Sequence, residues 1–255
     1  MKKLLFLFVL ILFSANAYAF SINIDPPSVY TKAKPGETVK TKISVENTSE
    51  ESVVLKVYLE DWQYLNDLSK KFLKLGSTPF SLKDAAKLYV KELRLQPKAK
   101  EDVLFEITSP TNKTGGLYGV VFFEAAPVLI NQNSNVHLIG RIGSIIYHEI
   151  EGTQDYNFDL AFVNYDQEKS RTKLDFSFVN RSNIHLNLKG SLLILDKNHK
   201  VIERIETTLK ALPKENQDII LYTSKKLGLG EKLCLFSLVY ENSKFFTKEI
   251  NFFVK

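Results

Sequence analysis

The stretch of sequence that decides the fold is residues 135–152, NVHLIGRIGSIIYHEIEG. In an extended chain successive side chains point to opposite faces, and one face of this stretch is rich in apolar residues. That face carries Val136, Leu138, Ile142, Ile146 and Ile150. The other face carries His137, Ile139, Arg141, Ile145, Tyr147 and Glu149. The alternation predicts a long β-strand that lies on a hydrophobic core.

The second face of the same stretch is also partly apolar. A long strand with apolar residues on both faces is either central in a sheet or an edge kept for a partner. Gly140 and Gly143 lie inside the stretch, where glycine usually marks a bulge or the close approach of another backbone. We predict that this strand is the last one of a first domain and leads directly into a second.

The N-terminal residues 1–19 have the organisation of a secretory signal peptide. Lys2 and Lys3 precede an apolar run, and Ala17-Tyr18-Ala19 fits the small-x-small rule for cleavage. The apolar run is too short to span a bilayer comfortably. We therefore expect cleavage after Ala19 and a periplasmic or secreted protein, with no integral membrane segment in the remaining chain.

The remaining chain, residues 20–255, is long enough for two ordinary domains. The sequence has 34 basic and 29 acidic side chains, and two of the basic ones lie in the leader, so the remainder has a net charge of +3. This small excess is scattered and argues against a nucleic-acid partner. Cys234 is the only cysteine, so packed cores rather than disulfides must hold the exported protein together. Its apolar neighbours predict that Cys234 is buried.

Residues 20–151 are predicted to form an immunoglobulin-like β-sandwich of seven to eight strands. Short apolar runs alternate with turn signals, and no long amphipathic helix is present. Pro26 and Pro27 split the first strand at the sheet edge, and one helical turn is expected after Ser81. Besides the opening stretch, strands are expected at residues 21–24, 29–33, 39–46, 53–65, 72–75, 89–95, 101–108 and 117–123.

Residues 152–255 show the same alternation of short apolar runs and turn signals, after a boundary at Gly152. Residues 196–199, DKNH, stand between two apolar runs and predict a hairpin. Strands are expected at residues 158–165, 174–180, 186–195, 201–209, 219–223, 233–240 and 245–254. The chain after the leader is thus predicted to be all-β, with two tandem immunoglobulin-like β-sandwich domains.

Residues able to carry out chemistry are scattered along the chain. His137, His148, His185 and His199 show no metal-ligand spacing and are expected to be surface residues. No phosphate-binding loop, nucleophile elbow or zinc-protease motif occurs. The sequence therefore predicts a protein that is not an enzyme, with no catalytic residues, no metal site and no cofactor.

The sole tryptophan, Trp62, lies two residues from Tyr64 on one face of a predicted strand. Such an aromatic pair either fills the core of a sandwich or stacks on a sugar. The core position is the commoner of the two, and we predict it here.

Several segments of the chain resemble a known family. They are residues 22–28 (INIDPPS), 35–36 (PG), 43–47 (ISVEN), 116–124 (GLYGVVFFE) and 140–147 (GRIGSIIY). The first three resemble the opening of periplasmic pilus-assembly chaperones, and the last two are similar to the sixth and seventh strands of that family. Residues 178–186, FVNRSNIHL, are similar to the second domain of related chaperone-like secreted proteins.

The resemblance implies two immunoglobulin-like domains set at an angle, with a fibre subunit docked along the seventh strand of the first domain. It also implies two basic residues that anchor the terminal carboxylate of the subunit. In this sequence Ser28 and Gly143 stand where the basic residues of the family fall, and Arg141 lies close to the second position.

Two functions fit these observations. One is an exported chaperone-like protein that holds a fibre or surface subunit by β-strand addition. The other is a structural or adhesive cell-envelope protein that binds other surface proteins. In the first reading the partner binds along residues 136–150 and meets Ile139, Arg141, Ile145 and Tyr147, with Arg141 facing a carboxylate or a backbone carbonyl. The alternative for the same strand is pairing on both sides, with Arg141 solvated.

Overall fold

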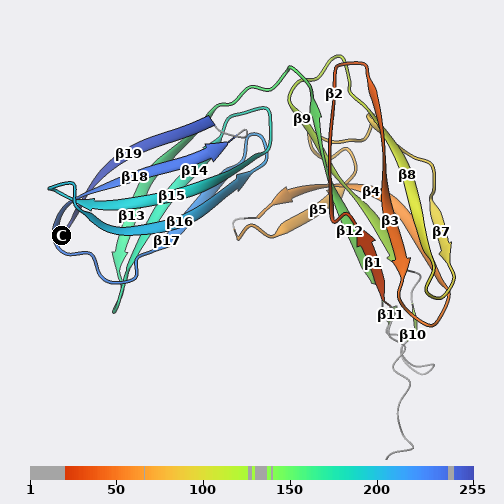
Figure 1. Cartoon of the computed structure of the whole chain (residues 1–255), viewed down its shortest axis with the longest axis horizontal. Coiled ribbons are helices and arrows are strands. Elements are labelled where there is room, and N and C mark those ends of the chain that lie inside the picture. The colour runs from red at the N-terminus through yellow and green to blue at the C-terminus, as the bar shows by residue number, and fades with distance from the viewer. Residues whose placement is uncertain (1–20, 66, 126–127, 130–136, 139, 241–243) are drawn as a thin grey trace, which may run out of the picture.

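The structure is a computed structural model that describes residues 21–65, 67–125, 128–129, 137–138, 140–240 and 244–255. Within these ranges the regular elements are all β-strands, and they form two sandwiches that lie beside each other at an angle (Figure 1). The predicted fold of two tandem immunoglobulin-like sandwiches is confirmed. The predicted leader and Ile139 lie outside the described residues. No helix among the described residues is long and apolar enough to cross a membrane.

The first sandwich packs a four-stranded sheet against a six-stranded sheet. The four-stranded sheet has the order β1 (Ile22–Asp25), β3 (Thr38–Asn47), β8 (Lys100–Thr108) and β6 (Ala86–Leu88). The six-stranded sheet has the order β2 (Ser28–Ala33), β12 (Arg141–Ile150), β9 (Gly116–Ala125), β4 (Val53–Tyr64) and β5 (Lys70–Lys74), with β7 (Glu92–Leu95) also paired to β4. A separate ribbon joins β10 (Val128–Leu129) to β11 (His137–Leu138).

The predicted splitting of the first strand is present. β1 pairs with β3 in one sheet, whereas β2 pairs with β12 in the other. Pro26 and Pro27 lie between the two pieces, where they have no N–H group to offer to a ladder. After Ser81 a single turn forms, because the N–H of Ala86 donates to the carbonyl of Leu82 at 2.8 Å, and β6 then begins.

The second sandwich packs a three-stranded sheet against a four-stranded sheet. The first has the order β13 (Phe158–Gln167), β14 (Thr172–Asn180) and β17 (Asn216–Tyr222). The second has the order β16 (Val201–Ala211), β15 (Leu186–Asp196), β18 (Gly230–Tyr240) and β19 (Lys244–Val254). The predicted hairpin joins β15 to β16. Cys234 is fully buried as predicted, and burial raises the pKa of its thiol to about 12.

Two of the histidines contradict the prediction that they are surface residues. His148 is fully buried in the first sandwich, where its ring nitrogens lie 2.9 Å from Thr31 Oγ1 and 2.7 Å from Ser109 Oγ. His185 is half-buried between the two sandwiches. The prediction was wrong because polar partners for these rings come from strands that are distant in the sequence. His199 is exposed, in the β15–β16 hairpin.

Candidate partner-binding site

Strand β12, which carries the predicted binding residues that the structure describes, is paired differently along its two halves. It is antiparallel to β9 from Arg141 to Glu149. On its other side it pairs with β2 only from Ile145 to Ile150, in parallel. No strand of the described chain pairs with the second edge of residues 141–144. Residues 145–149 of β12 are therefore paired on both sides, whereas residues 141–144 have one edge that no described strand covers.

The outward backbone groups of the edge half follow from the hydrogen bonds at its ends. The N–H of Ile145 donates to the carbonyl of Pro27 on the β2 side, at 3.1 Å. The carbonyl of Gly140 accepts the N–H of Ala125 on the β9 side, at 2.9 Å. Because backbone groups alternate along a strand, those of Arg141 and Gly143 point to the β2 side, which is the open edge.

Arg141 stands at the start of this open edge, and its charge is balanced within the protein. Its Nη1 atom lies 3.3 Å from both carboxylate oxygens of Glu60 and 3.3 Å from the hydroxyl of Tyr58. The guanidinium carbon lies 4.1 Å from the centroid of the Phe122 ring. The hydrogen bond with Tyr58 is the main cause of the raised pKa of Arg141. The Arg141 side chain remains 38% exposed, so it also reaches solvent beside the open edge.

Ile145 and Tyr147 belong to the central half of β12. They face the outer face of the six-stranded sheet, the face turned away from the sandwich core, and are 8% and 9% exposed. There they join an apolar cluster with Trp62, Tyr118, Val120, Phe122 and Leu212. The structure thus places Arg141, Ile145 and Tyr147 on one sheet face, as the alternation predicted, with only Arg141 at the open edge.

The second sandwich covers part of this outer face. We call Trp62, Tyr64, Tyr118, Tyr147 and His185 the interdomain aromatic cluster. The ring of His185 lies 4.8 Å from that of Tyr147, and the backbone N–H of His185 donates to the hydroxyl of Tyr118 at 2.6 Å. Burial, together with nearby lysines, lowers the pKa of His185 to about 3, so the ring is neutral.

Glu215 makes a second connection between the sandwiches. Its carboxylate accepts the backbone N–H of Tyr64 at 3.2 Å and that of Leu212 at 2.8 Å. Burial raises the pKa of Glu215. A third connection is the hydrogen bond from the N–H of Gly116 to the carbonyl of Asn183, at 2.9 Å. These contacts hold the second sandwich against the outer face at several points.

The prediction that Trp62 fills the sandwich core is wrong. Trp62 is 1% exposed, but it lies in the outer cluster with Tyr118 and Leu212 rather than in the core of the first sandwich. It is the second domain that buries this side chain. A sequence pattern shows that two residues share a strand face, but it does not show what covers that face.

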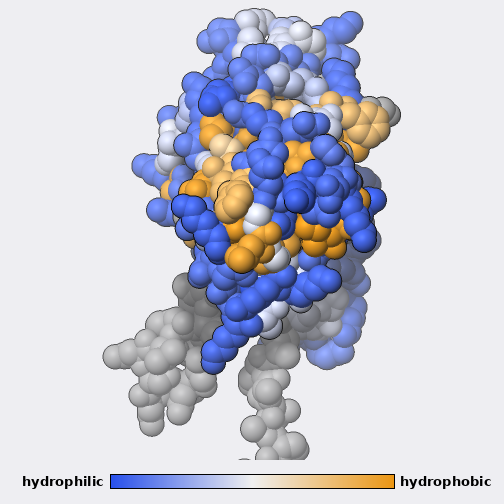
Figure 2. Space-filling view, turned by 90° about the vertical axis from the view of Figure 1, so that its left-hand side faces the viewer, coloured by the Kyte–Doolittle hydropathy of each residue, from blue (hydrophilic) through white to orange (hydrophobic). Residues whose placement is uncertain are grey.

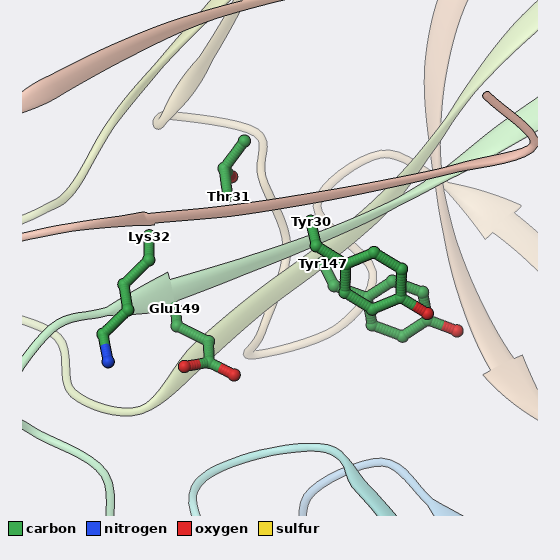
Figure 3. A pocket seen from close by; sticks show the side chains of 5 residues that line it. All are labelled: Tyr30, Thr31, Lys32, Tyr147 and Glu149. Atoms are coloured by element: carbon green, nitrogen blue, oxygen red, sulfur yellow. The ribbon is translucent and has the colours of Figure 1, made fainter. Parts of the chain in front are cut away.

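A shallow pocket of about 230 Å³ opens beside Tyr147 (Figure 3). Its walls are Tyr30, Thr31 and Lys32 from β2 and Tyr147 and Glu149 from β12. The rings of Tyr30 and Tyr147 are stacked, with centroids 4.7 Å apart and an interplanar angle of 4°. Tyr30 is 71% exposed, so its second ring face is open to a partner.

At positions 28 and 143, where the resemblance implies basic residues, this chain has Ser28 and Gly143. A Cβ atom at Gly143 would lie 2.7 Å from Cγ2 of Val120 and 2.8 Å from the ring of Phe122. Phe122 therefore takes up the space that a side chain at position 143 would need. Ser28 is paired with Ile145 at the end of the β2 ladder. The cation nearest to these positions along β12 is Arg141, which is already paired with Glu60.

Sequence reasoning missed Tyr30, Tyr118 and His185 as residues of this surface. Tyr118 lies on β9, which is buried along nearly its whole length, so no polar face marks its orientation. Tyr30 could have been found from the sequence, because it is an aromatic residue on a predicted edge strand. The described residues contain no group of three or more His, Cys, Asp and Glu side chains that could hold a metal ion.

Comparisons with known proteins agree with this architecture. The sequence matches no family model and no curated protein. The structure is similar to that of the class 5 fimbriae chaperone CfaA, with a TM-score of 0.53 and 12% identity over 90% of this chain and 98% of that one. It is also similar to a chain from a chaperone–tip adhesin complex of CFA/I fimbriae biogenesis, with a TM-score of 0.50, 12% identity and the same coverage. The chain therefore has the two-domain fold of the pilus-assembly chaperones.

Proposed function

We propose that this protein is an exported, non-enzymatic, chaperone-like protein that holds a fibre or surface subunit by β-strand addition in the periplasm. The observation that carries the proposal is the half-paired strand β12, which presents an open edge at residues 141–144. The fold supports it, since one of the similar structures is part of a chaperone–tip adhesin complex.

The subunit strand would add to the edge through main-chain hydrogen bonds. The N–H and C=O groups of Arg141 and Gly143 point to the open side, and an added strand pairs with such groups. Gly143 has no side chain to obstruct an approaching backbone. Arg141 then meets an acceptor of the subunit beside Glu60. The alternation in the sequence predicts a place for Ile139 on the same face, outside the described residues.

In this proposal Ile145 and Tyr147 lie beneath the bound subunit and support the residues that contact it. Both are nearly buried in the outer face, so they support the exposed ring of Tyr30 and the edge rather than enter a groove of the subunit. The proposal includes export with cleavage after Ala19 and a domain boundary at Gly152, between the end of β12 and the start of β13. The exported chain should begin at Phe20 in N-terminal sequencing.

The experiment compares two changes at Arg141 in the tagged, exported chain, captured from an envelope extract of its own host. Arg141→Ala removes the side chain and keeps the outward N–H. Arg141→Pro removes the N–H as well, without touching the groups that pair with β9. We expect a fibre or surface subunit to be captured by the wild type and by Arg141→Ala, and to be lost with Arg141→Pro.

Equal capture by wild type and Arg141→Pro would contradict strand addition at this edge. Near-ultraviolet circular dichroism of both variants shows whether the first sandwich is intact. Capture of large envelope proteins that remain bound, in place of a small subunit that is passed on, would favour the structural or adhesive function.

A further inference from the structure

The outer face of the β16-β15-β18-β19 sheet in the second sandwich carries an apolar block that the proposed chaperone function does not use. In an antiparallel sheet with one solvated face, the outward side chains are usually polar. Here Leu193 and Leu195 on β15 point outward, because their neighbours Leu192 and Ile194 are fully buried in the core; Leu193 is half-buried and Leu195 is 9% exposed. On β18, Leu233 and Leu235 point outward in the same way beside the buried Cys234.

These four leucines form a compact square. The strand register pairs Leu193 with Leu235 and Leu195 with Leu233. At the same end of the sheet lie Val201, 52% exposed, and Phe253, 56% exposed. Figure 2 looks onto this end of the second sandwich and shows apolar residues gathered between hydrophilic ones.

Opposite charges flank the square on its two sides. Arg204 on β16 is the register partner of Leu193, and Glu249 on β19 is the register partner of Leu235. One row across the sheet therefore reads Arg204, Leu193, Leu235, Glu249. The two charged residues are both exposed and are separated by two strands, so they are about 14 Å apart and do not meet within one molecule. Within the chain Arg204 Nε lies 2.7 Å from Glu206 Oε1, a pair that is itself exposed to solvent.

We propose that this face binds the same face of a second copy of the chain, about a two-fold axis parallel to the strands. Such an axis reverses the order of residues along each row. Arg204 then faces Glu249 of the other copy, twice by symmetry, and the leucine square packs on its own image. The contact is self-complementary in charge and in apolar surface, as an isologous interface must be.

The size of the face indicates a weak dimer. Each of the four strands has 11 residues. At about 3.3 Å per residue and about 4.8 Å between strands, the face measures roughly 35 by 15 Å, or about 500 Å² per copy. A total of about 1,000 Å² is near the lower limit of specific interfaces, which indicates dissociation in the micromolar range.

The test is sedimentation equilibrium of the exported chain from about 1 to about 100 µM, the range in which an interface of this size dissociates. Glu249→Arg places Arg204 against a second arginine, and we expect it to weaken the dimer roughly tenfold or more. Arg204→Glu should do the same. The double variant, R204E with E249R, restores opposite charges across the interface, and we expect its dissociation constant to return close to that of the wild type.

Asp218→Arg is the matched control, because it makes the same change of charge at an exposed position on the other sheet. It should leave the dimer unchanged. A wild-type chain that stays monomeric over the whole range would overturn the proposal. A double variant that dimerises as weakly as either single variant would also overturn it. Since Arg204 and Glu249 do not meet within one copy, rescue by the double variant has no intramolecular explanation.

Discussion

The backbone N–H of His185 donates to the hydroxyl oxygen of Tyr118 at 2.6 Å, and this hydrogen bond joins the two sandwiches. Tyr118 is 3% exposed, and burial raises the pKa of its hydroxyl, which therefore stays neutral. Tyr118 lies on β9, the strand that pairs with β12 from Arg141 to Glu149. The contact thus sets the second sandwich over the same sheet that presents the open edge.

Tyr118→Phe should destabilise the protein by about 1–3 kcal/mol, because the partly buried N–H of His185 would lose its acceptor. The measurement is the free energy of unfolding in urea. Tyr165→Phe is the control. Its hydroxyl accepts the N–H of Lys255 at 2.8 Å, but at an exposed chain end, so we expect a change within about 0.5 kcal/mol. Equal losses of unfolding free energy in the two variants would show that the hydrogen bond between His185 and Tyr118 contributes no more than an exposed one.

Acid should weaken the fold through the buried His148 and the half-buried His185. Burial lowers the pKa of His148 to about 4 and that of His185 to about 3, from an ordinary value of 6.5. Because the folded-state values lie below the unfolded ones, the unfolded chain binds more protons as the pH falls. The stability that neutral histidines provide is full above about pH 6.5 and is lost progressively as the pH falls toward the folded values. Glu215, whose pKa is raised, opposes this loss.

The measurement for this prediction is the urea midpoint at about pH 7.5 and at about pH 5, below the unfolded histidine pKa. We expect a lower midpoint at the acid pH, and a smaller difference between the two conditions in His148→Gln and His185→Gln. His199→Gln, at an exposed hairpin position, should keep the full difference. The same pH dependence in all four proteins would exclude the rings of His148 and His185 as its source.

Any side chain at Gly143 should disturb the outer face. The Cβ of Gly143→Ala would press on Val120 and on the ring of Phe122, and we expect a loss of about 1–3 kcal/mol. Gly143→Lys, which supplies the basic residue that the resemblance implies, should be worse still. Gly228→Ala is the control, since its Cβ would meet nothing within 4 Å. Thermal unfolding of the three variants gives the comparison, and a stable Gly143→Lys would contradict the crowding argument.

Asn180 should be essential to the second sandwich. Its Nδ2 atom donates to the carbonyls of Ile184, Ala211 and Leu212, each at 3.0 Å, and its Oδ1 accepts the N–H of Ser182 at 2.9 Å. The residue is fully buried. Asn180→Ala leaves these groups without a partner and should cost about 1–3 kcal/mol or more.

The exposed Asn187 on β15 offers a control for that substitution, because Asn187→Ala should have little effect. Chemical denaturation followed by far-ultraviolet circular dichroism measures both. A loss for Asn180→Ala no larger than that for Asn187→Ala would show that the buried network contributes little.

The sequence by itself determined the strands and their faces. The period of two placed Ile146 and Ile150 in the core and Ile145 and Tyr147 on the opposite face, as the structure has them. It also placed Cys234 in a core and split the first strand at Pro26. These properties are local, because side-chain alternation and the missing N–H of proline act within a few residues.

Only the tertiary structure decided what each face and edge meets. The ladder between β2 and β12 begins at the pair Ser28 and Ile145, directly after the two prolines. It joins segments more than a hundred residues apart in the sequence. The burial of Trp62 depends on Leu212 of the other sandwich, and that of His148 depends on Thr31 and Ser109. Such contacts follow from the relative placement of whole sheets, which the local alternation of apolar residues does not specify.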